Sequence, residues 1–94
     1  MSNVTIGQWV FDDVDYDGDA DVLYLSIGQP RRGYGQESPE GHVWRFDGDG
    51  NFCGLTLIGV RDLIDAGEVT ITVPMPPQPE LLDRKSLNRV LVGA

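Results

Sequence analysis

Alternating aspartates near the start of the chain have a spacing suited to metal chemistry. Asp13, Asp15, Asp17, Asp19 and Asp21 are each separated by one residue, and Gly18 lies among them. This order matches the first, third, fifth, sixth, seventh and ninth positions of an EF-hand calcium loop, where alternate carboxylates converge on one cation and glycine permits a sharp turn. The five aspartates are therefore candidate metal ligands.

The rest of the calcium-loop pattern is missing. The twelfth position should hold a bidentate glutamate, and here it is Tyr24. The flanking residues have the composition of strands, whereas an EF-hand lies between two helices. Six carboxylates within ten residues also repel one another, which favours a solvated loop or turn. We therefore expect residues 12–21 to form an exposed turn, and we predict no metal and no cofactor.

The only histidine and the only cysteine have structural explanations. His42 has an ordinary pKa near neutrality, but it shares a strand face with Trp44, and no nucleophile or carboxylate beside it in the sequence suggests a catalytic set. Cys53 lies on the face of Leu55 and is expected to behave as a small buried hydrophobe. We predict no catalytic residue, and hence a protein that is not an enzyme.

Two further segments resemble binding motifs only superficially. The run Asp47-Gly48-Asp49-Gly50-Asn51 lacks the following helix of a phosphate loop and is typical of a hairpin turn. Arg31 and Arg32 precede an aromatic residue, as in some nucleic-acid contact loops. A net charge of -8 opposes binding to a phosphate backbone, so we predict no nucleic-acid partner.

Length and composition limit the remaining classes. The 94 residues suffice for one domain and no second core. No apolar run is long enough to cross a membrane, and the first twenty residues lack a signal-peptide pattern, so we expect a cytoplasmic protein without a membrane partner. A single cysteine cannot form an internal disulfide.

Short alternating segments separated by turn residues predict a sheet. The expected strands are residues 4–11, 22–27, 42–46, 52–58 and 69–73, and the third and fourth form a hairpin. Residues 28–41 are rich in glycine and polar side chains and are expected to be a long mobile loop. Residues 61–66 predict a short helix that stops at Gly67. The expected core residues are Trp9, Phe11, Leu23, Leu25, Ile27, Trp44, Phe46, Leu55, Leu57, Ile71 and Val73.

The C-terminal part predicts a proline-rich connector and an amphipathic helix. Four prolines within residues 74–79 favour a stiff connector that cannot continue a sheet. Leu87, Val90 and Leu91 form an apolar stripe within residues 80–92, which must pack on its own sheet or on another subunit. The expected organisation is a β-rich core over residues 1–73, a connector over 74–79 and a helix over 80–94. This is a single α+β domain with an antiparallel sheet of about five strands, a short helix and a C-terminal helix.

Two blocks of the sequence resemble the small bacterial family DUF2283. The run Tyr16-Asp17-Gly18-Asp19-Ala20-Asp21-Val22-Leu23-Tyr24-Leu25 is similar to that family's opening signature. Residues 43–58, in which a glycine precedes alternating leucines, resemble its second block, whereas the helix start after the hairpin and the proline-rich end depart from it. The resemblance implies a compact α+β domain on an antiparallel sheet. It implies no activity, and an antitoxin or accessory role is suggested only by the genes thought to neighbour some members.

Three functions are compatible with these features. The first is a non-enzymatic interaction module that uses a sheet edge, or the stripe of Leu87, Val90 and Leu91, to form a dimer or bind a protein partner. An antitoxin-like or acidic inhibitor would instead meet a basic protein through its aspartates. A small ligand-binding domain or enzyme would need a concave pocket near His42, Tyr24 or Arg45.

Overall fold

A five-strand antiparallel sheet forms the centre of the protein. The structure is a computed structural model that describes residues 3–29, 31–67, 69–82 and 84–93. Across the sheet, the strand order is β3 (Asp13–Asp17), β4 (Val22–Ser26), β7 (Phe52–Ile58), β6 (Val43–Asp47) and β5 (Gly33–Glu37). The predicted α+β domain with an antiparallel sheet of five strands is confirmed.

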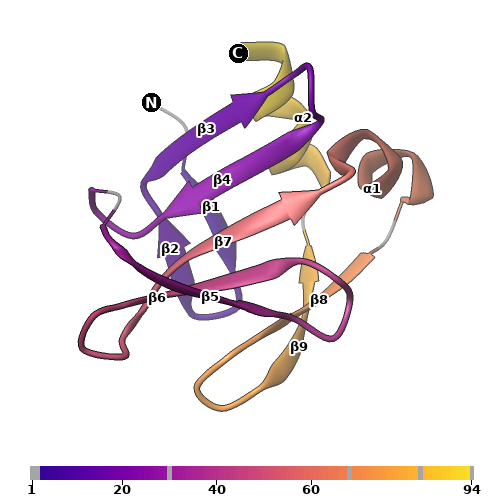
Figure 1. Cartoon of the computed structure of the whole chain (residues 1–94). Helices are drawn as coiled ribbons and strands as arrows, with labels where there is room; N and C mark the ends of the chain where they lie inside the picture. The colour runs from indigo at the N-terminus through magenta and orange to yellow at the C-terminus, as the bar shows by residue number, and fades with distance from the viewer. Residues whose placement is uncertain (1–2, 30, 68, 83, 94) are drawn as a thin grey trace.

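Two hairpins and one helix cover one face of this sheet. The hairpins are β1 (Val4–Ile6) with β2 (Trp9–Phe11) and β8 (Val69–Val73) with β9 (Gln78–Leu82), and the helix is α2 (Arg84–Gly93). Figure 1 shows these elements behind the sheet, while no described element lies in front of it. The short helix α1 (Val60–Ala66) follows β7 and packs against α2. The sheet therefore has a covered inner face and an open outer face.

Strand alternation assigns the side chains to these two faces. Leu23 and Leu25 of β4 pair with Leu57 and Leu55 of β7, and all four are buried on the inner face. Among the predicted core residues only Trp9 and Ile27 are half-buried, and both pack against the core. The buried apolar cluster is Val4, Ile6, Phe11, Leu23, Leu25, Trp44, Phe46, Phe52, Leu55, Leu57, Val60, Ile71, Val73, Leu82, Leu87 and Val90.

The predicted β6–β7 hairpin forms around the Asp-Gly turn, with one irregularity. Arg45 pairs with Gly54 and Phe46 with Phe52, so Cys53 is an extra residue without a partner in β6. Such a bulge restores the inward direction of both phenylalanines. Their rings lie 5.9 Å apart in an edge-to-face arrangement inside the core.

Two expectations for the N-terminal part were wrong. Residues 4–11 are a hairpin rather than one strand, because Gly7 adopts a φ of 61° and reverses the chain. Residues 13–17 form the edge strand β3 rather than a loop. Val14 and Tyr16 pack inward against the core, and burying them outweighs the repulsion among the aspartates on the solvent side.

Residues 28–41 were expected to be only a loop, yet they contain β5. This strand pairs with β6 along all five of its residues, from Gly33 opposite Asp47 to Glu37 opposite Val43. Its glycines permit the close approach, since a Cβ at Gly33 would lie 1.7 Å from the carbonyl oxygen of Phe46.

The prediction of a proline connector was also wrong. The chain turns at residues 74–77 and returns as β9, where Pro79 lies opposite Thr72 of β8. Proline is tolerated there because β9 is an edge strand, whose outward positions need no amide donor. The C-terminal helix consequently begins at Arg84 rather than at residue 80.

The short helix and its stop are confirmed. The helix α1 ends before Gly67, which has a φ of 88° and donates its amide to the carbonyl of Ile64. Neither this helix nor α2 has the length and apolar content required to cross a membrane.

Candidate functional site

The five candidate metal ligands do not converge on one point. Asp13, Asp15 and Asp17 lie along β3, where side chains of alternate residues project in the same direction about 7 Å apart. Asp17 accepts hydrogen bonds from the amides of Asp19 and Ala20 at 3.1 and 3.3 Å, which closes the β3–β4 turn. Among the described residues no group of three histidine, cysteine or acidic side chains is placed to hold a metal ion. The cage of a calcium loop is therefore not formed in this part of the chain.

Asp21 has a structural role at the start of α1. Its backbone carbonyl accepts the amides of Gly59 and Val60, and its carboxylate accepts the amide of Arg61 at 3.2 and 3.1 Å. A carboxylate is favourable there because the free amides at a helix N-terminus attract negative charge. The Tyr16 hydroxyl also donates to Asp21 at 2.7 Å, and this hydrogen bond raises the pKa of Tyr16.

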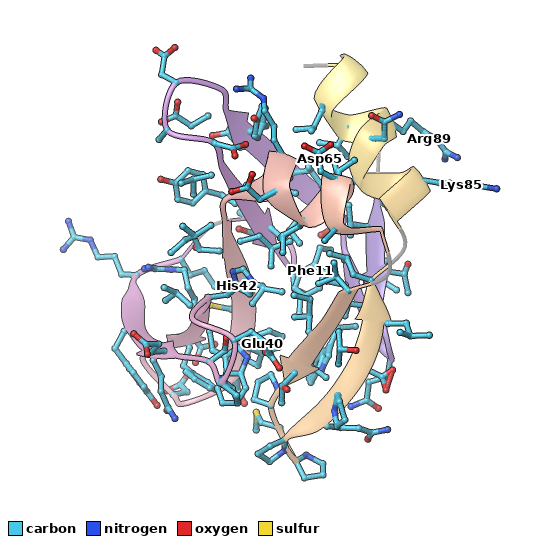
Figure 2. All side chains as sticks on the ribbon, turned by 90° about the vertical axis from the view of Figure 1, so that its right-hand side faces the viewer. Phe11, Glu40, His42, Asp65, Lys85 and Arg89 are labelled. Carbon is cyan, nitrogen blue, oxygen red and sulfur yellow. The ribbon has the colours of Figure 1, made fainter. Side chains whose placement is uncertain are left out.

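A second polar group fastens the β8–β9 hairpin to the sheet. Glu40, in the turn before β6, accepts the amide of Thr72 at 2.9 Å and its hydroxyl at 2.6 Å. The carbonyl of Thr72 accepts the indole N–H of Trp44 at 2.8 Å. Figure 2 shows Glu40 reaching toward the hairpin. We call Glu40, Trp44 and Thr72 the clamp. The carboxylate of Glu40, the indole N–H of Trp44 and the amide, hydroxyl and carbonyl of Thr72 all have hydrogen-bond partners in the clamp, which is typical of a structural contact.

His42 lies beside the clamp and is buried. It is 5% exposed, and its Nδ1 accepts the amide of Ile58 at 3.1 Å. Burial lowers the pKa of His42, and the nearby Glu40 carboxylate opposes this effect. Burial would raise the pKa of Glu40, but hydrogen bonds from Thr72 outweigh it and leave that pKa below its usual value. His42 therefore ties the segment before β6 to the backbone of β7 at Ile58.

The apolar stripe predicted for interaction packs inside its own chain. Leu87 and Val90 belong to the buried cluster, and Leu91 packs against it. One of the two packing arrangements left open by the sequence is thus observed, with the stripe on its own core.

The open face of the five-strand sheet carries a groove lined by charged and hydroxyl side chains together with apolar surface. It has a volume of about 350 Å³ and crosses the strands β3, β4, β7 and β6. This volume lies at the lower end of the range typical of ligand sites, which is about 300–1,000 Å³. The lining residues are Asp13, Asp15, Tyr24, Leu25, Ser26, Arg31, Arg45 and Thr56. A smaller hollow of about 30 Å³ shares Ser26, Arg31 and Arg45 and adds Cys53 and Gly54.

Strand register places opposite charges at the two ends of the groove. Asp13 pairs with Ser26 on β4, Ser26 with Gly54 on β7, and Gly54 with Arg45 on β6. Gly54 keeps the middle of this row low, and a Cβ there would lie 2.8 Å from the carbonyl oxygen of Leu25. The groove thus has carboxylates at the β3 end and guanidinium groups at the β6 end.

Arg31 is held over this groove by the β6–β7 turn. Its guanidinium donates to the carbonyl of Ile27 at 3.2 Å and lies 3.8 Å from the carboxylate of Asp47. Amide hydrogen bonds from Asn51 and Asp49, together with the charge of Arg31, hold the pKa of Asp47 below its usual value despite partial burial. Asp47 therefore remains ionised and orients Arg31.

Sequence reasoning named Tyr24 and Arg45 as candidates for a pocket but missed how the site is assembled. The aspartates of β3 face the arginines only because β4 and β7 lie between them. The alternation Asp13-Val14-Asp15-Tyr16-Asp17 was a usable strand signal that the charge density obscured. Comparisons of the chain with protein families, with curated proteins and with solved structures found no match.

Proposed function

We propose that this protein is a non-enzymatic interaction module that forms a homodimer by pairing β5 with β5 of a second copy. The observation that carries this proposal is the position of β5 at an edge of the sheet, with all five of its residues exposed. An edge strand presents unpaired amide and carbonyl groups that a strand of another chain can complete.

The two edges of the sheet differ in their suitability for pairing. β3 carries Asp13, Asp15 and Asp17, and charged side chains are a common protection of an edge against association. β5 carries one charged residue, Glu37, and two glycines. The acidic edge therefore repels another copy of this acidic chain, whereas β5 offers an accessible backbone.

The sequence around β5 is complementary to itself. In an antiparallel pair centred on Gly35, Gly33 lies opposite Glu37 of the second copy. Arg32 precedes the first residue of β5, so strand alternation does not fix its side chain on the far face, and its long side chain can pass the side-chain-free Gly33 to reach that glutamate. Two-fold symmetry forms the Arg32–Glu37 contact twice. Both residues are exposed in the single chain and are free to make it.

The net charge of -8 does not prevent this pairing. Four strand steps separate β5 from β3, which amounts to about 19 Å at the usual strand spacing. The screening length at physiological ionic strength is about 8 Å. Repulsion from the aspartates of β3 is therefore weak at the β5 edge.

Charge reversal tests the proposal. Sedimentation from micromolar to near-millimolar protein should show a dimer for the wild type. Arg32→Glu should raise the dissociation constant about tenfold, because two attractive contacts become repulsive. Combining it with Glu37→Arg should restore the dimer, and Arg89→Glu on α2 provides a control with the same change in charge. A wild type that stays monomeric throughout, or a double variant no better than Arg32→Glu, would overturn the pairing.

The resemblance to DUF2283 is a further part of this proposal. It is supported by an antiparallel sheet in which both similar blocks, residues 16–25 and 43–58, form paired strands. It assigns no activity.

A further inference from the structure

We propose that the groove on the open face of the sheet binds a short peptide with free termini, its ammonium group at Asp13 and Asp15 and its carboxylate at Arg31 and Arg45. The proposal goes beyond dimerisation at β5. It rests on three features of the groove: charges of which three of the four have no partner among the described residues, a span that fits a few residues, and a floor that can donate and accept hydrogen bonds.

Within the described residues, three of the four charged side chains of the groove have no partner, whereas Arg31 is shared with the carboxylate of Asp47 at 3.8 Å. In the described part of the chain, Asp13, Asp15 and Arg45 have no hydrogen bond or ion pair through their side chains. Other acids of this chain, such as Asp12 and Asp17, accept backbone amides and thereby stabilise turns and loops. The groove is thus a place where charged groups converge without a structural role. Convergent polar groups in a concave surface are the usual mark of a ligand site.

The separation of the charges indicates the size of the ligand. Three strand steps lie between the backbone of Asp13 and that of Arg45, which is about 14 Å. The aspartate and the long arginine side chain cover part of this span. An extended peptide advances about 3.3–3.6 Å per residue, so two or three residues fill the remainder. A single amino acid is too short to reach both ends at once.

The sign of the charges selects a zwitterion. An anion would be attracted by Arg31 and Arg45 but repelled by the two aspartates. A cation would be attracted by the aspartates but repelled by the arginines. A molecule with an ammonium group at one end and a carboxylate at the other satisfies both ends. Arginine suits the carboxylate end because its planar guanidinium forms two parallel hydrogen bonds with a carboxylate.

The floor provides groups for the middle of a peptide. Tyr24, Ser26 and Thr56 line the groove and bring hydroxyl groups, which both donate and accept. Tyr24 is 44% exposed, so its ring also offers an apolar surface to a small side chain. Gly54 adds no side chain, and the clash of a Cβ with the carbonyl of Leu25 keeps this position open.

Titration with trialanine tests the proposal directly. Amide chemical shifts in NMR spectra should move at Ser26, Arg45 and Thr56 and report a millimolar or tighter dissociation constant at low salt. N-acetyl-trialanine, which lacks the ammonium group, and trialanine amide, which lacks the carboxylate, should each bind about fivefold or more weakly, as expected for loss of a partly exposed charge contact. Glycine should bind more weakly than trialanine because it cannot span the groove.

Variants assign the two ends of the peptide. Asp13→Asn should weaken trialanine binding about fivefold and Arg45→Gln by a similar factor, since each removes one charge contact. Asp19→Asn and Arg89→Gln are controls that change the charge equally outside the groove. After Arg45→Gln, trialanine and its amide should bind alike. Three results would overturn the proposal: no shift change with about 10 mM trialanine, equal binding of the acetylated peptide, or shift changes confined to other strands.

The proposal of a β5 dimer and the proposal of peptide binding in the groove can be tested separately. Sedimentation of Arg32→Glu reports β5 pairing and leaves the groove residues unchanged. Trialanine binding to that variant should equal binding to the wild type. A loss of peptide binding on reversal of Arg32 would contradict the independence of the two sites and overturn the assignment of the peptide to the groove.

Discussion

The two faces of the five-strand sheet use polar side chains in opposite ways. On the inner side, Glu40, Thr72 and Trp44 form a clamp whose donors and acceptors are matched across two sheets. On the outer side, Asp13 and Arg45 meet no partner among the described residues. A buried polar group without a partner destabilises a fold, so matched polar groups near the core are retained for stability. Exposed charges that stabilise nothing internally are available for binding.

Neighbouring residues on β6 give the largest expected contrast between the two faces. Trp44 is 5% exposed and points into the core, whereas Arg45 points outward. Trp44→Ala should lower the free energy of unfolding by about 3–5 kcal/mol, because it leaves a cavity and removes the indole donor to Thr72. Arg45→Ala should change it by about 0.5 kcal/mol or less. Urea unfolding of both variants measures the difference, and similar losses for the two would contradict the assignment of the outer face to binding.

The clamp itself gives a smaller contrast. Thr72→Val keeps the shape of the side chain but removes the 2.6 Å hydrogen bond to Glu40. Because the glutamate is largely exposed, water can replace the lost partner, and the expected loss is about 1 kcal/mol. Thr70→Val on the exposed side of β8 is the matched control and should lie within about 0.5 kcal/mol of the wild type. Equal effects at both threonines in urea unfolding would mean that the clamp does not stabilise the hairpin.

The difference between the faces also explains how much could be predicted. The β6–β7 hairpin followed from local turn chemistry, because an Asp-Gly pair supplies the positive φ that joins two strands. β3 and β5 were missed because their local composition, aspartates in one and glycines in the other, disfavours strands in isolation. Both strands are formed by pairing with a neighbour and, in β3, by the inward packing of Val14 and Tyr16.

The candidate site was harder to predict than the fold. The groove draws on four strands and on Arg31, and its two charged ends are more than thirty residues apart in sequence, from Asp13 to Arg45. The strand registers bring the polar residues of the groove into two rows, Asp13–Ser26–Gly54–Arg45 and Asp15–Tyr24–Thr56. Such long-range pairing depends on tertiary packing, which a single sequence does not specify locally.

Acidification gives the smallest expected difference between the two faces. It lowers the stability of the inner side through protonation of His42. Burial lowers the pKa of His42 in the folded protein, while the unfolded chain retains the ordinary value of 6.5. As the pH falls through that value, the unfolded state binds a proton that the folded state does not yet bind, so stability decreases with decreasing pH. The contribution of neutral His42 to the free energy of unfolding is fully present above about pH 7. It is lost as the pH drops from the pKa of His42 in the unfolded chain toward its lower pKa in the folded protein.

Glu40 adds a second loss at lower pH. Its folded pKa lies below the ordinary 4.5, so its contribution to stability is present above that value and is lost as the pH falls through the folded pKa.

The two pKa shifts predict the pH dependence of urea unfolding. The urea midpoint of the wild type should decline between about pH 7 and pH 5 through His42, before the carboxylates titrate. His42→Gln keeps an acceptor for the amide of Ile58 and removes the titration, so its midpoint should be flat over the same interval. An equal decline in this variant would show that another group senses the proton and that the buried histidine does not couple acidification to the inner face.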